Sequence, residues 1–120
     1  MQATDFWGEI GTTDVRTPLS ILREQAAALG PRTKNIVEAK VETTVIGGYF
    51  VHSFSLVVPS LDNYKYELFD VRHEPDLYPV RVDTFTDLAN EDAFKTWLRE
   101  RLSSERTRKI VNNLLAQAQS

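Results

Sequence analysis

The chain has 120 residues, a formal net charge of −3 at pH 7 and no cysteine. A hydrophobic fraction of 42% with 26% charged residues is typical of a folded protein of this length. We therefore expect a single domain over residues 1–120, because two separate cores would be hard to build from so short a chain. The absence of cysteine excludes disulfides, thiol nucleophiles and thiolate metal sites.

The net negative charge also restricts the classes of partner that the chain can bind. Nucleic-acid binding depends on concentrated positive charge, so the net charge of −3 argues against a nucleic-acid partner. The sequence has neither a signal-peptide pattern nor an apolar run approaching the ~18 residues that span a bilayer. We expect a cytoplasmic protein with no membrane partner, no cofactor and no metal.

Residues 1–16 lack hydrophobic periodicity and predict an irregular N-terminal arm. Its large apolar side chains are Phe6, Trp7 and Ile10. Aromatic side chains bury much area at little entropic cost, so they could anchor the arm in a surface groove. The alternative is a frayed terminus.

A first helix is predicted over Pro18–Leu29. Thr17 suits the N-cap position and Pro18 the first helical position. Apolar residues then recur at helical spacing up to Leu29. Gly30-Pro31 is a typical stop signal.

The dipeptide Gly47-Gly48 predicts a hairpin, because a two-residue loop of this kind supplies the positive φ angles that tight hairpins require. The flanking strands are expected near residues 36–46 and 49–58. The expected cross-strand pairs are Ile46 with Tyr49, Val45 with Phe50, Val41 with Phe54 and Ala39 with Leu56. This register puts the apolar sets of both strands on one face of the sheet.

Two further strands are expected, over residues 64–72 and 78–83. In the first of them the alternation changes phase, since Phe69 and Val71 fall on the opposite face from Tyr64 and Tyr66. Either both faces are partly buried there or a bulge reverses the phase. Pro79 places the second of these strands at a sheet edge.

The C-terminal third predicts helices. Asn90 is a suitable N-cap for the first, and Ser103 or Ser104 caps a second, although the two segments could also form one bent helix. The predicted fold is therefore α+β. It is a four-stranded antiparallel β-meander with an N-terminal helix and two C-terminal helices packed on one face.

The face of the sheet opposite the helices is the first candidate for function. On the expected register it carries the apolar side chains Tyr49, Val51, Val57, Phe69 and Val71. A solvated sheet face is usually more polar. We expect these residues to form a homodimer interface or to lie under the N-terminal arm. The favoured function is a non-enzymatic protein-interaction or regulatory module, whose partner is itself or another protein.

The alternative is a small enzyme or ligand-binding domain that uses His52 or the Asp70–Asp76 segment. His52 is expected on the apolar face opposite Thr43, where burial lowers the pKa of its imidazole. His73 lies near several carboxylates, although Asp70 should point away from it on the other strand face. No metal-binding motif matches this spacing. These three residues, His52, His73 and Asp70, are weak candidates for catalysis.

The C-terminal helices also carry a basic stretch. It comprises Arg99, Arg101, Arg106, Arg108 and Lys109. Glu100 and Glu105 are interleaved with it, which favours a solvated helix face over a surface for an acidic partner or nucleic acid.

Overall fold

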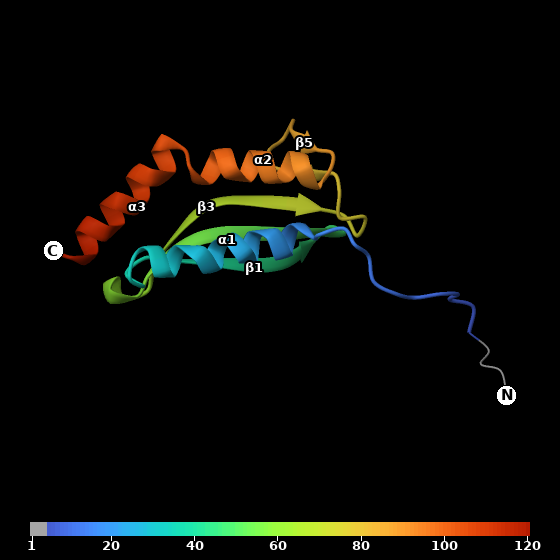
Figure 1. Cartoon of the computed structure of the whole chain (residues 1–120), viewed down its shortest axis with the longest axis horizontal. Coiled ribbons are helices and arrows are strands. Elements are labelled where there is room, and N and C mark those ends of the chain that lie inside the picture. Colours follow the sequence, from blue (N-terminus) through green and yellow to red (C-terminus); the bar gives the residue numbers. More distant parts are fainter. Residues whose placement is uncertain (1–4) are drawn as a thin grey trace.

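A five-stranded antiparallel sheet with helices packed on one face forms the domain, in the strand order β1-β2-β3-β4-β5 (Figure 1). The computed structural model describes residues 5–120, so residues 1–4 of the predicted arm lie outside the described residues. The elements are α1 Pro18–Arg32, β1 Glu38–Ile46, β2 Tyr49–Val58, the 3-10 turn η1 Pro59–Leu61, β3 Tyr64–His73, β4 Val80–Arg81, β5 Asp87–Leu88, α2 Glu91–Leu102 and α3 Glu105–Ala118.

The predicted α+β class and helix arrangement are confirmed, with one difference in the sheet. The predicted strand over 78–83 is reduced to the two residues of β4, and a short β5 adds a fifth strand. The predicted edge position of this strand is wrong, because β4 pairs with β3 on one side and with β5 on the other. Pro79 lies directly before β4, where its missing N–H limits the length of the ladder. No helix in the described part of the chain is long and apolar enough to cross a membrane.

The hairpin is confirmed residue by residue. Ile46 pairs with Tyr49 and Val41 with Phe54, as the alternation predicts. Gly47 and Gly48 have φ angles of 56° and 84°, so both central residues of the turn adopt the left-handed conformation of a type I′ turn.

We expect Gly48→Val to lower the free energy of unfolding by about 1–2 kcal/mol, because a β-branched residue is strained at positive φ. The backbone around Gly48 is open, so the loss would come from conformation and not from a clash. Urea denaturation measures it. Gly48→Asn is the matched control and should be nearly neutral, since Asn tolerates this conformation. Equal losses in both variants would argue against the conformational explanation.

A bulge in β3 resolves the phase change. Phe54 pairs with Phe69, but the next pair along is Ser55 with Glu67, so Leu68 is the extra residue. The bulge returns Phe69 and Val71 to the helix-covered face, where both are buried in the main core. Their expected place on the open face is therefore wrong.

Helix α1 runs three residues beyond its predicted end. Gly30 is not in the left-handed conformation, and the helix continues through Pro31 to Arg32. Thr33 ends it instead: its backbone N–H donates to the Gly30 carbonyl, and its hydroxyl lies 3.2 Å from the same carbonyl oxygen. The same hydroxyl is within hydrogen-bond distance of the backbone N–H and C=O of Val37, which joins the helix end to the start of β1.

The C-terminal segment forms two helices. Ser104 is the N-cap of α3, and its side chain accepts a hydrogen bond from the Thr107 N–H. Asn90 and Thr17 cap α2 and α1 in the same way, as predicted. The helices cover β1, β2 and β3, and the main core lies between α1, α2 and the sheet.

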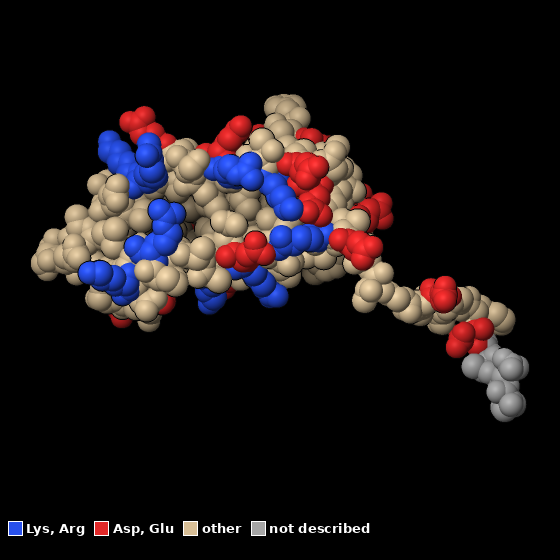
Figure 2. Space-filling model, viewed as in Figure 1, with Lys and Arg blue, Asp and Glu red and all other residues tan. Residues whose placement is uncertain are grey.

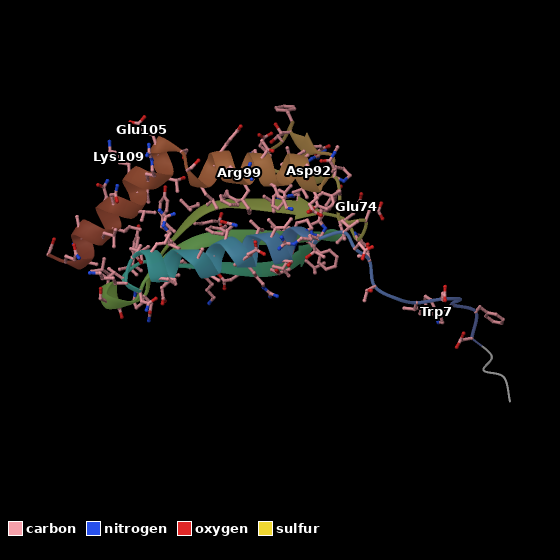
Figure 3. All side chains as sticks on the ribbon, viewed as in Figure 1. Trp7, Glu74, Asp92, Arg99, Glu105 and Lys109 are labelled. Atoms are coloured by element: carbon pink, nitrogen blue, oxygen red, sulfur yellow. The ribbon has the colours of Figure 1, made fainter. Side chains whose placement is uncertain are left out.

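The N-terminal arm extends away from the domain (Figure 1). Phe6 is 100% exposed and Ile10 76%, and Trp7 lies far out on the arm (Figure 3). The arm is therefore not anchored in a groove of its own domain, and it does not cover the open face of the sheet.

Candidate functional site

A groove of about 530 Å³ runs between α1 and α2 on the helical side of the molecule. We call it the helix groove. Its lining residues are Arg16, Ile21, Glu24, Gln25 and Arg32 on the α1 side, Lys95, Leu98, Arg99 and Leu102 on α2, and Ser103 and Arg108 beyond α2. Hydrophobic side chains from both helices line it beside the charged groups.

The charge of the helix groove is opposite to that of the whole chain. Five of its lining residues are Lys or Arg and one is a carboxylate, whereas the chain carries a net charge of −3. Figure 2 shows Lys and Arg gathered around this hollow, while Asp and Glu gather toward the N-terminal ends of α1 and α2 and on the arm. Such a concentration of one sign in a cleft attracts ligands of the other sign.

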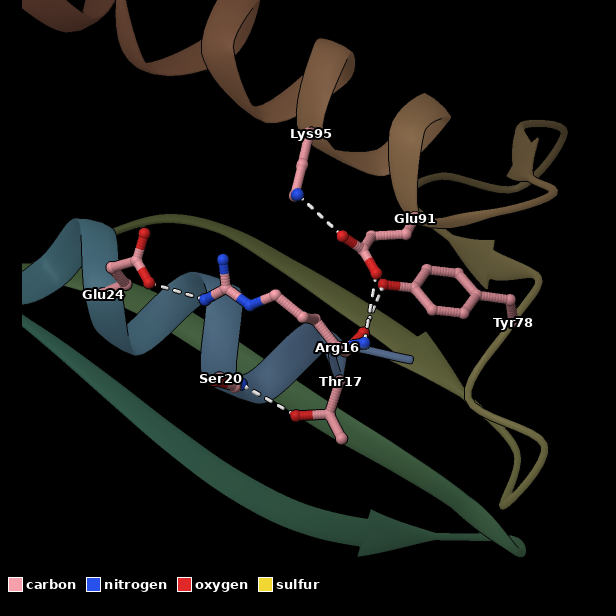
Figure 4. Close-up of polar contacts among 7 residues, drawn as sticks. All are labelled: Arg16, Thr17, Ser20, Glu24, Tyr78, Glu91 and Lys95. Atoms are coloured by element: carbon pink, nitrogen blue, oxygen red, sulfur yellow. Dashed lines mark hydrogen bonds and ion pairs between the residues drawn. The ribbon is translucent and has the colours of Figure 1, made fainter. Parts of the chain in front are cut away.

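The cations differ in whether they are already paired. Near the N-terminal ends of the helices, Arg16 pairs with Glu24 at 2.5 Å and Lys95 with Glu91 at 2.6 Å (Figure 4). The Lys95 ammonium and the Arg16 backbone N–H lower the pKa of the Glu91 carboxyl. Toward the C-terminal ends of α1 and α2 the cations of the groove are unpaired within the described part of the chain. Three arginines there have no ion-pair partner among residues 5–120, namely Arg32, Arg99 and Arg108.

Next to these arginines a smaller apolar hollow of about 140 Å³ reaches down to the sheet. It shares Gln25, Arg32 and Leu102 with the helix groove. Its other lining residues are Ala28, Leu29, Phe54, Leu56, Leu68, Thr107 and Val111. The site therefore combines unpaired positive charge with a place for one apolar side chain.

His52 and His73 form the second cluster, and the structure brings them into direct contact. Their Nε2 atoms lie 2.8 Å apart, and the rings are 2% and 4% exposed. His52 Nδ1 is 2.8 Å from the Thr43 hydroxyl, the strand partner predicted for it. His73 Nδ1 is 2.7 Å from the Glu74 carbonyl oxygen. Phe50 packs beside His73, with ring centroids 5.5 Å apart.

The hydrogen-bond network assigns the protons of this pair. A carbonyl only accepts, so His73 donates from Nδ1 to Glu74 and a neutral His73 accepts at Nε2. His52 then donates from Nε2 and accepts the Thr43 hydroxyl proton at Nδ1. Burial, with further effects of His73 and Arg23, lowers the pKa of His52 to about 4. All four ring nitrogens are occupied by protein atoms, so none is free to meet a substrate.

The Asp70–Asp76 segment does not form a site with the histidines. Asp70 and Arg72 lie on the open face, opposite Ser53 and Val51, whereas His73 points into the core, as the strand alternation predicts. β3 extends through His73, one residue beyond the end of the predicted strand. Within residues 5–120, no group of three or more His, Cys, Asp or Glu side chains could hold a metal ion.

The open face of the sheet is mostly polar and not apolar as expected. Tyr49, Val51 and Val57 do lie on it, but Phe69 and Val71 do not. Val51 is 5% exposed between Thr44 and Arg72. Charged neighbours on this face pair with one another, Glu42 with Lys65 and Arg81 with Asp87. The five residues therefore form no continuous apolar patch.

Sequence reasoning missed the helix groove. The basic stretch around Arg99 and Arg108 is a signal of this site in the sequence, but the interleaved Glu100 and Glu105 favour a solvated helix face. Arg32 lies on another helix, far away in the sequence, and only the packing of α1 beside α2 brings it to the same groove. No known protein family, curated protein or solved structure shows significant similarity to this chain.

Proposed function

We propose that this chain is a non-enzymatic protein-interaction module that binds an acidic segment of a protein partner in the helix groove. The observation that carries the proposal is the set of three unpaired arginines, Arg32, Arg99 and Arg108, beside an apolar hollow. A partner with carboxylates next to an apolar side chain would satisfy both features. Arginine suits carboxylates, because its planar guanidinium can donate two parallel hydrogen bonds.

A protein segment fits this groove better than nucleic acid. Single-stranded nucleic acids bind where bases stack on exposed aromatic rings. Among residues 5–120, the only aromatic residue lining either the helix groove or the apolar hollow is Phe54, which is 2% exposed. The overall charge of −3 also repels a polyanion outside the groove.

The enzyme alternative has less support. A general base must present a nitrogen or oxygen to its substrate. The ring nitrogens of His52 and His73 form hydrogen bonds with each other, with the Thr43 hydroxyl and with the Glu74 carbonyl. Neither ring therefore presents a nitrogen to a substrate. Asp70 lies on the other face of the sheet.

The test is an NMR titration of the ¹⁵N-labelled chain with a short peptide in which Asp and Glu alternate with Phe and Leu. We expect shift changes at the backbone amides around Arg32, Arg99 and Arg108, with an affinity that falls as salt rises. Arg99→Glu/Arg108→Glu should weaken binding by more than about tenfold, since each lost charge contact contributes on the order of 1 kcal/mol.

The matched control is Arg106→Glu/Lys109→Glu, which reverses two charges on α3 outside the helix groove and should bind like the wild type. A peptide with Lys in place of the acids should not bind. Tighter binding of single-stranded DNA than of the acidic peptide, or shifts confined to another surface, would contradict the proposal.

A further inference from the structure

The N-terminal arm has the composition that the helix groove requires. Residues 5–15 contain three carboxylates and no Lys or Arg. The carboxylates are Asp5, Glu9 and Asp14, and the apolar residues among them are Phe6, Trp7, Ile10 and Val15. In the structure these apolar side chains are exposed, Phe6 completely and Trp7 to 79%. An arm that presents two aromatic side chains to water is a candidate for binding elsewhere.

We propose that the helix groove receives the N-terminal arm of a second copy of this chain, and that two copies exchange their arms reciprocally. The inference rests on the proposed function and names the partner of that site. The acidic arm and the basic groove are complementary in charge, and the apolar side chains of the arm match the apolar hollow beside the groove.

The point where the arm leaves the domain favours a second copy over the arm's own groove. The Arg16 backbone N–H donates to Glu91 at 3.1 Å, and the Tyr78 hydroxyl donates to the Arg16 carbonyl at 2.9 Å (Figure 4). Both backbone groups of Arg16 are thus fixed at the N-terminal end of α1, and the arm points away from the domain (Figure 1). To enter its own groove, the chain would have to reverse direction directly before this anchor.

The arm is long enough for the groove. Its 11 residues, 5–15, span about 36 Å when extended, whereas the 15 residues of α1 are about 22 Å long. The apolar hollow of about 140 Å³ suits a phenyl ring, since an apolar cavity of ~150 Å³ accepts benzene. We assign Phe6 to this hollow. Asp5 and Glu9 would then flank it, close to the three unpaired arginines.

The area is also sufficient for a dimer. A buried aromatic side chain removes roughly 150–250 Å² from water, so Phe6 and Trp7 of two arms would remove about 600–1,000 Å². The groove surfaces that they cover add to this area. Stable interfaces bury about 1,200–2,000 Å² in total, which two exchanged arms can reach.

A charge exchange tests the proposal in the full chain. The arm variant is Asp5→Lys/Glu9→Lys, and the groove variant is Arg99→Glu/Arg108→Glu. Light scattering should give a dimer mass for the wild type and a monomer mass for each variant alone, because each then opposes like charges. An equimolar mixture should recover the dimer mass, since every arm in a mixed pair meets a groove of opposite charge.

The control is again Arg106→Glu/Lys109→Glu, which should remain a dimer, and circular dichroism should show that all variants are folded. A monomeric wild type overturns the exchange, whether its arm is free or docked in its own groove. A dimer that neither charge-reversed variant weakens overturns it as well. If the chain is monomeric but its groove still binds the acidic peptide, only this inference fails. If the groove binds neither the arm of a second copy nor the acidic peptide, the proposed function fails too.

Discussion

We expect Phe94→Ala to lower the free energy of unfolding by about 3–5 kcal/mol, a large part of the 5–15 kcal/mol that stabilises a typical domain. Phe94 is on α2, has no exposed surface and belongs to the main core between the helices and the sheet. Its ring stacks on Trp97 with centroids 6.2 Å apart. Its removal leaves a cavity where α2 packs against the sheet, and urea denaturation measures the loss.

Phe85→Ala is the matched control, because it makes the same substitution at a residue that is 94% exposed. It should change the free energy of unfolding by no more than about 0.5 kcal/mol. The urea dependence of Phe94→Ala should keep the wild-type slope, which would show that stability and not the extent of unfolding has changed. A loss below about 1 kcal/mol for Phe94→Ala would contradict the described core.

The parts of the fold that the sequence predicted are those set by local chemistry. The β1–β2 register follows from Gly47-Gly48 and from strict alternation on both sides of it. The helix starts follow from N-cap side chains at Thr17, Asn90 and Ser104. In each case the residues that determine the structure lie within a few positions of it.

The errors that misplace candidate site residues occur where distant segments decide the outcome. The bulge at Leu68 depends on how β3 pairs with β2, and the alternation of β3 alone allowed two interpretations. The choice matters, because the bulge moves Phe69 and Val71 from the open face to the core. It also aligns β3 so that His73 contacts His52, a contact that the sequence pattern does not predict.

The candidate site was only partly visible in the sequence. A basic stretch near Arg99 and an N-terminal arm with the aromatic residues Phe6 and Trp7 are both visible in the sequence. Their relation is not, because it requires knowing that α1 and α2 leave a groove between them and that Arg32 lines it. Charge complementarity between a groove and an arm can be judged only after helix packing has defined the groove.

Acidification should destabilise the protein through His52. Burial lowers the pKa of this imidazole from about 6.5 in an unfolded chain to about 4 in the folded one. The folded state then binds fewer protons than the unfolded state, so this contribution to stability is complete above about pH 6.5 and is lost as the pH falls toward 4. The groups facing the ring that act in the same direction are His73 and Arg23. We expect a loss of about 2 kcal/mol between pH 6.5 and pH 4.5.

His52→Gln separates this titration from the rest of the acid response. Glutamine can still donate an N–H to His73 Nε2, but it cannot take up a proton, so the variant should lose little stability between pH 6.5 and pH 4.5. Carboxyls with lowered pKa, such as Glu42 beside Lys65 and Asp87 beside Arg81, act only at lower pH and should affect both proteins equally. Urea denaturation across this pH range gives the comparison. If wild type and His52→Gln lose the same stability, His52 is not the group whose protonation opposes folding.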